Sequence, residues 1–163
     1  MSNFQESDPF VRHLLSEHHR LHEMLQQARQ VIAGAKEASE ILPTLQEVRE
    51  ELRRHFIQEE QGGCLEEAAS HCPALTPDVQ RLEDEHPRLL ADLDRLVAQV
   101  EDAEPGIQDR LALQNRFMDL CRELHAHEAA ENRLLARGFG TNVNGDEIGS
   151  STDALRRFHA PVN

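Results

Sequence analysis

Apolar residues recur along the chain at steps of three or four positions, the spacing that places them on one face of an α-helix. The first stripe follows the helix-start signal Ser7-Asp8-Pro9 and should end near Gly34; it comprises Phe10, Leu14, Leu21, Leu25, Ala28 and Ile32. The second begins around Pro43 and is stopped by Gly62-Gly63; it comprises Leu45, Val48, Leu52 and Phe56. Together the two stripes predict a helical hairpin.

The second half of the chain repeats this pattern. Thr76-Pro77-Asp78 is a second start signal, and the stripe after it comprises Val79, Leu82, Leu89, Leu93, Leu96 and Val100. A fourth helix should follow Glu104-Pro105-Gly106 and end near Gly138; its stripe comprises Leu113, Phe117, Leu120, Leu124, Leu134 and Leu135. The connector 63–77 has room for a turn or two of helix. Four helices with short connections predict an all-α, antiparallel up-down-up-down four-helix bundle.

The chain therefore divides into a bundle over residues 1–137 and a C-terminal tail over residues 138–163. The tail is rich in Gly, Asn and Ser and has little room for a core of its own. We expect it to pack on the bundle or on a second copy in a homodimer, or to stay mobile. Ser151-Thr152-Asp153 could cap a short helix that runs to Phe158.

The composition narrows the class of partner. A formal net charge of −13 disfavours nucleic acid and anionic membrane surfaces, because both recruit basic patches. The N-terminus does not have the pattern of an export signal, and no stretch approaches the roughly 18 apolar residues of a membrane span. We expect a cytoplasmic protein whose three cysteines, Cys64, Cys72 and Cys121, are reduced thiols.

Ten histidines in a chain without Trp or Tyr are the compositional anomaly. Their positions show an internal repeat. Ser16-Glu17-His18-His19-Arg20-Leu21 can be laid on Asp84-Glu85-His86-Pro87-Arg88-Leu89, and the second helix of each hairpin contains His-x-x-x-Glu. This motif places an imidazole and a carboxylate one turn apart on one helix face. The sequence therefore has a pseudo-twofold relation between its two hairpins.

The repeated polar residues fall where the apolar stripes require core residues. In the first helix, for example, Leu14 and Leu21 flank a histidine at helical spacing. The inward-facing polar set comprises His18, His55, Glu59, His86, His127 and Glu131. Buried without partners, the ionised groups would each cost several kcal/mol, which a marginally stable domain does not tolerate. A pair of cations bridged by the carboxylates and completed by the imidazoles would neutralise them.

One histidine and one His-x-x-x-Glu in each hairpin, on successive helices, resembles the hemerythrin-like, or HHE cation-binding, family over roughly residues 10–137. The resemblance implies two iron ions with an oxo or hydroxo bridge. It also implies that His18, His55, His86 and His127 are terminal ligands and that Glu59 and Glu131 bridge the two irons. Ferritin-like di-iron bundles are the nearest rival, but they need two Glu-x-x-His motifs and two further glutamates, and this chain has only Glu83-x-x-His86.

The chain departs from the oxygen carriers of that family at two places. They have a fifth histidine one turn along the third helix, where this chain has Leu90, and an aspartate where it has Glu131. His22, one turn after His18, could supply the fifth histidine if the pseudo-twofold exchanges the hairpins. The alternative is that His22 lines a cavity beside the ligands.

By the same resemblance, the function is the binding of dioxygen, nitric oxide or peroxide at a non-haem di-iron centre, for carriage, sensing or detoxification. An enzyme that breaks down peroxide or nitric oxide is one form of this function. The alternative is an iron-sensing or regulatory module in which the metal mainly stabilises the bundle. A second, weaker metal hypothesis is zinc at Cys64, His71 and Cys72, whose spacing is unlike that of zinc sites.

Overall fold

The computed structural model describes residues 9–103 and 109–140, and these ranges are helical without any strand. The elements in chain order are α1 (Pro9–Gly34), α2 (Ala38–Gly62), α3 (Cys64–His71), the short 3-10 helix η1 (Pro73–Leu75), α4 (Thr76–Glu101) and α5 (Arg110–Phe139). The prediction of an all-α protein with four long helices is therefore confirmed.

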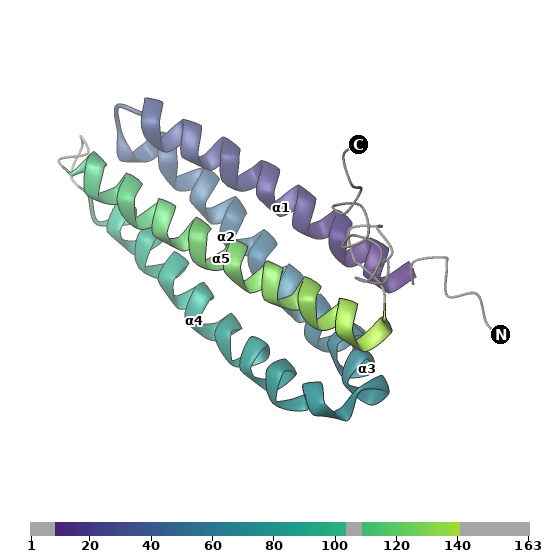
Figure 1. The fold of residues 1–163 in the computed structure, drawn as a ribbon. Coiled ribbons are helices and arrows are strands. Elements are labelled where there is room, and N and C mark those ends of the chain that lie inside the picture. Colours follow the sequence, from purple (N-terminus) through teal and green to yellow (C-terminus); the bar gives the residue numbers. More distant parts are fainter. Residues whose placement is uncertain (1–8, 104–108, 141–163) are drawn as a thin grey trace, which may run out of the picture.

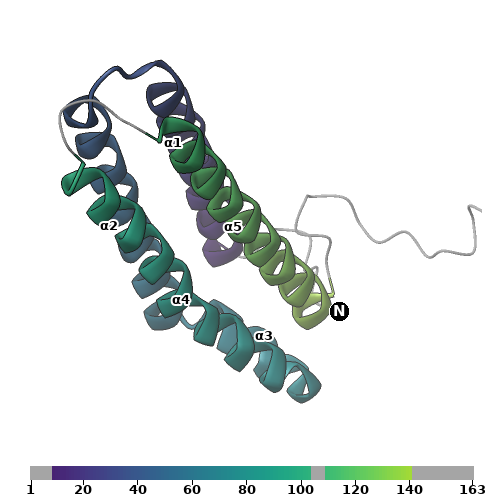
Figure 2. The same cartoon turned by 90° about the vertical axis from the view of Figure 1, so that its left-hand side faces the viewer.

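The four long helices lie side by side as a bundle (Figures 1 and 2). Helix α1 packs on α2 and α5, and α4 packs on the same two helices from the other side. The short helix α3 covers one end of the bundle, where it contacts α5, α4 and α2. This arrangement encloses a single long interior between the four helices.

The interior holds two apolar clusters with a polar layer between them. One cluster includes Leu21 of α1 and Leu89 of α4, and the other includes Leu14 and Leu82 of the same helices. In α1 and α4 the buried histidine lies between these leucines in sequence, one turn from each. The polar residues of α2 and α5 also lie between members of the two clusters. Apolar packing on both sides therefore holds the polar layer in place and keeps water from it.

Helix α2 begins at Ala38, so the predicted start around Pro43 is wrong by more than a turn. The Glu40 carboxylate accepts hydrogen bonds from the backbone N–H groups of Lys36 and Glu37, at 3.1 and 3.2 Å, and so satisfies donors that have no partner at a helix start. The added turn also buries Ile41 completely. Burial of a side chain of this size contributes about 1.5 to 3 kcal/mol, which offsets the backbone hydrogen bond that Pro43 cannot make.

The predicted helix ends agree with the structure to within a residue or two. Helix α1 ends at Gly34, and α2 ends at Gly62 before Gly63, whose φ of 70° is in the left-handed region that glycine favours. Near the end of α5, a Cβ added at Gly138 would lie 2.5 Å from the Cβ of Ala68 in α3. Only glycine therefore allows α3 and α5 to approach this closely. The predicted connector helix is confirmed as α3.

Two sequence predictions fall outside the described residues. The tail from residue 141 onward and the short helix proposed after Ser151 both lie beyond the described part of the chain. Within the described ranges, none of the helices combines the length and the apolar character needed to cross a membrane.

Candidate metal centre

Six titratable side chains from the four long helices meet in the polar layer. Each of the six is buried, and Glu131 is fully inaccessible at 0% exposure. Helix α1 supplies His18, α2 supplies His55 and Glu59, α4 supplies His86, and α5 supplies His127 and Glu131. These are six of the seven residues that the sequence pattern singled out.

The first half of the layer joins α1 and α2 to both carboxylates. The Nε2 atom of His18 lies 3.4 Å from Glu59 Oε1 and 3.3 Å from Glu131 Oε2. The Nε2 atom of His55 lies 2.9 Å from Glu59 Oε1. Both imidazoles therefore direct the same ring nitrogen toward the carboxylates.

The second half repeats this arrangement with α4 and α5. The Nε2 atom of His127 lies 3.1 Å from Glu131 Oε1, one turn away on the same helix. The Nε2 atom of His86 lies 3.4 Å from Glu59 Oε2 and 3.9 Å from Glu131 Oε1. The internal repeat of the sequence thus reappears as two histidine pairs around a shared carboxylate pair.

The ligand atoms form two overlapping groups that could each hold a metal ion. In one group, His18, His55, Glu59 and Glu131 offer atoms that all lie within 4.8 Å of one another; in the other, Glu59, His86, His127 and Glu131 do the same. Glu59 and Glu131 belong to both groups. Two carboxylates shared in this way could bridge two ions.

The hydrogen-bond inventory also favours a cation. The Nε2 atoms of His55, His86 and His127 are buried and lie 2.9 to 3.4 Å from carboxylate oxygens, but none of these contacts has the geometry of a hydrogen bond. Both carboxylate oxygens of Glu131 and one of Glu59 are also without one. Native interiors rarely leave such atoms unpaired, because each costs about 1 to 3 kcal/mol. Ring nitrogens and carboxylate oxygens that lie this close together without hydrogen bonds are suited to be metal ligands.

Without a cation, protons would have to balance the two carboxylates. Burial alone would lower the pKa of His18, but contacts with Glu131 and Glu59 outweigh it and raise the pKa to about 10. Burial is likewise outweighed at His127, whose pKa rises to about 9 mainly through Glu131. Burial would raise the pKa of Glu131, yet its histidine neighbours hold that pKa well below the usual range. Metal binding would therefore displace protons from the imidazoles.

Outer carboxylates hold three of the four histidine rings. The Nδ1 atoms of His86 and His127 each lie 2.8 Å from a carboxylate oxygen, of Glu60 and Glu85 respectively. The Nδ1 atom of His55 lies 3.4 Å from Glu17. A carboxylate that accepts from Nδ1–H fixes the ring tautomer, leaves Nε2 free to bind metal and makes it more basic.

Sequence reasoning did not identify these outer carboxylates, although the repeat contained the signal. Glu17 and Glu85 each come directly before a buried histidine, at equivalent positions of the two hairpins. Each contacts a histidine of the other helix in its own hairpin rather than its sequence neighbour. A glutamate that precedes the buried histidine in both hairpins therefore indicated a carboxylate next to the ligands.

The surroundings of the fourth ring, that of His18, do not follow the pseudo-twofold relation between the hairpins. Glu60 follows Glu59 in α2, and the equivalent position after Glu131 in α5 is Asn132. The Nδ1 atom of His18 and the Oδ1 atom of Asn132 are both buried without a hydrogen bond among the described residues. The outer hydrogen bonding of the two histidine pairs therefore differs.

Phe56 forms an apolar wall beside the second half of the layer. Its ring stacks on His86, with centroids 4.0 Å apart and planes 5° apart, and meets His127 edge-on at 5.6 Å. It is 2% exposed. The ring therefore fixes the imidazole planes and keeps solvent from this side.

His22, the seventh candidate, belongs to neither group of the polar layer. It lies instead with His125 and Glu128, on the side where α1 meets α5. The connector residues Cys64, His71 and Cys72 are not among the groups that reach metal-ligand spacing in the described part of the chain.

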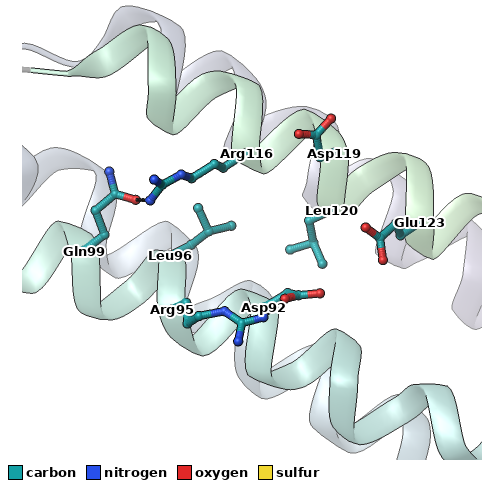
Figure 3. Close-up of a pocket in the computed structure, with 8 residues that line it drawn as sticks. All are labelled: Asp92, Arg95, Leu96, Gln99, Arg116, Asp119, Leu120 and Glu123. Atoms are coloured by element: carbon teal, nitrogen blue, oxygen red, sulfur yellow. Dashed lines mark hydrogen bonds and ion pairs between the residues drawn. The ribbon is translucent and has the colours of Figure 1, made fainter.

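A surface pocket of about 400 Å³ lies between α4 and α5 (Figure 3). Its arginines are paired with other lining residues: Arg116 donates to Gln99 at 2.8 Å, and Arg95 pairs with Asp92. It shares no residue with the histidine–glutamate groups. The buried polar layer therefore remains the candidate site.

No protein-family model, curated protein or solved structure matches this chain.

Proposed function

We propose that this chain is a hemerythrin-like protein, an antiparallel up-down-up-down bundle that holds two iron ions and binds dioxygen, nitric oxide or peroxide. The observation that carries the proposal is the shared pair of buried carboxylates, Glu59 and Glu131, each within reach of two histidine pairs. The ligand set is the six residues of the polar layer. It contains four histidines rather than the five that the sequence suggested, because His22 lies in another group.

The donor chemistry supports iron. Imidazole suits iron, zinc and copper, whereas the softer thiolate ligands that favour clusters are absent from the two groups in the described residues. Carboxylates bridging a metal pair inside a helical bundle are the arrangement of di-iron proteins. Two irons bound there would supply electrons and open coordination positions to a small ligand.

The protein's own residues set the conditions for that ligand. Each ion would have two histidines and two carboxylates as protein ligands, so room remains for a further bridge and an exogenous ligand. Phe56 and the apolar clusters on both sides exclude water from the centre. The exclusion of water strengthens the electrostatic interactions inside and keeps solvent protons from a bound ligand. Glu60 and Glu85 hold the rings of His86 and His127 in one tautomer.

The test is to load the full chain with Fe²⁺ without oxygen and then to admit dioxygen, nitric oxide or peroxide while recording the visible spectrum. The proposal predicts new absorption bands in the wild type and in His19→Ala, which changes an exposed histidine on α1. It predicts their loss in His127→Ala. Reversal when dioxygen is removed would indicate carriage, and steady oxygen evolution from peroxide would indicate turnover. An iron-loaded, folded protein that reacts with none of the three ligands would contradict the proposal and favour a regulatory module.

A further inference from the structure

Helices α1 and α5 pack against each other (Figure 1). A separate group of potential metal ligands joins these two helices. It consists of His22 from α1 and of His125 and Glu128 from α5. Each offers one ligand atom, and these atoms all lie within 4.8 Å of one another. None of the three belongs to the two groups of the polar layer.

The three side chains are arranged as a set. His125 and Glu128 are three residues apart, so they occupy one face of α5. From the facing helix, His22 contacts Glu128 through Nε2 and a carboxylate oxygen. The rings of His22 and His125 stack with centroids 5.0 Å apart and planes 26° apart. Two helices thus bring two imidazoles and a carboxylate together.

The second observation concerns Glu128 itself. This residue is only 4% exposed, although His125 and Ala126, in the turn before it, are exposed. One of its carboxylate oxygens, Oε1, is buried without a hydrogen-bond partner among the described residues. A simple ion pair between His22 and Glu128 explains only the other oxygen and gives no role to His125. A cation bound by all three residues would account for the unpaired oxygen of Glu128 and for the position of His125.

We propose that His22, His125 and Glu128 form a mononuclear site for a divalent first-row transition metal ion. Two imidazoles and one carboxylate suit Fe²⁺, Co²⁺ or Zn²⁺, whereas Ca²⁺ and Mg²⁺ prefer sets of oxygen ligands. His125 is exposed and the side chain of His22 is 37% exposed, so water completes the coordination and the ion enters directly from solvent. The site depends on no residue of the dimetal centre, so it stands or falls independently of the proposed function.

The experiment uses the full chain, stripped of metal with a chelator and titrated with Co²⁺ by calorimetry and visible absorption. His125→Ala removes one ligand at an exposed position, where the change should not affect folding. His19→Ala is the matched control, because it removes an exposed histidine on α1 whose ion-pair partner within the described residues is Glu23. Titration of each variant with Ca²⁺ tests the choice of metal.

The site predicts about three Co²⁺ ions per chain for the wild type and for His19→Ala, and about two for His125→Ala. Where a third binding step persists in His125→Ala, its affinity should be at least about tenfold weaker. Ca²⁺ should not compete. Equal numbers and equal affinities in His125→Ala and His19→Ala would overturn the site. If the dimetal centre alone were wrong, the wild type would bind about one ion and His125→Ala would lose it.

Discussion

Replacing Glu85 by alanine should weaken metal binding without disturbing the ligands themselves. Glu85 lies outside the two metal-ligand groups, and its carboxylate lies 2.8 Å from the Nδ1 atom of His127. In Glu85→Ala, the imidazole loses the acceptor that fixes its tautomer. Burial would lower the pKa of His127, and this hydrogen bond helps Glu131 to raise it to about 9 instead.

The magnitude follows from this outer contact. Loss of a carboxylate that orients a metal-bound histidine typically weakens metal affinity by about 10- to 100-fold. This range corresponds to about 1.4 to 2.7 kcal/mol of binding free energy. The lower end should apply to Glu85→Gln, whose amide oxygen can still accept from Nδ1–H but carries no charge.

The assay is competition between the protein and a chromophoric chelator for Co²⁺, with the full chain and its variants side by side. Asp84→Ala is the matched control, because Asp84 is the adjacent, exposed carboxylate on the same helix. Its replacement removes the same charge without removing a hydrogen bond to His127. An affinity of Glu85→Ala within about threefold of that of Asp84→Ala would refute the orienting role, since the charge alone would then explain the effect.

Three further predictions follow from the packing and the charges. Gly138→Ala should destabilise the fold by about 1 to 3 kcal/mol in urea unfolding, because its Cβ would lie 2.5 Å from that of Ala68; an unchanged midpoint would disprove the close contact. The metal-free protein should lose stability as the pH rises, because the pKa values of His18 and His127 are raised from 6.5 to about 10 and about 9. Their contribution is complete below pH 6.5 and gone above about pH 10, so thermal unfolding that is flat over this window would contradict it. Phe56→Leu should speed the loss of bound metal to a chelator, because solvent gains access on that side.

The sequence predicted the polar layer well because burial and periodicity agree there. A histidine between Leu14 and Leu21 at helical spacing must face the interior, and His18 does. The same reasoning failed at the start of α2, because the pattern predicts a helix that begins around Pro43 and the helix begins at Ala38. Glu37 is not a preferred capping residue, so the sequence gives no start signal there. The added turn is stabilised by the burial of Ile41, which depends on helices distant in sequence.

The position of His22 around the axis of α1, rather than its spacing from His18, explains why it lies outside the polar layer. It follows His18 by one turn, so both lie on related faces of α1. A helix turns 100° per residue, and a step of four residues therefore shifts a side chain by about 40° around the axis. This shift, together with the position of Glu128 on α5, directs His22 to the α1–α5 side. The sequence gives no access to the placement of the facing helix.

The central claim is that the shared carboxylates hold two irons, and metal analysis of the aerobically purified full chain tests it most directly. The visible spectrum should be recorded before and after dithionite. The account predicts about two irons per chain that resist a chelator, with bands that bleach on reduction. A colourless chain that is folded, contains no metal and takes up none would contradict it, because the buried histidines and glutamates would then need no cation.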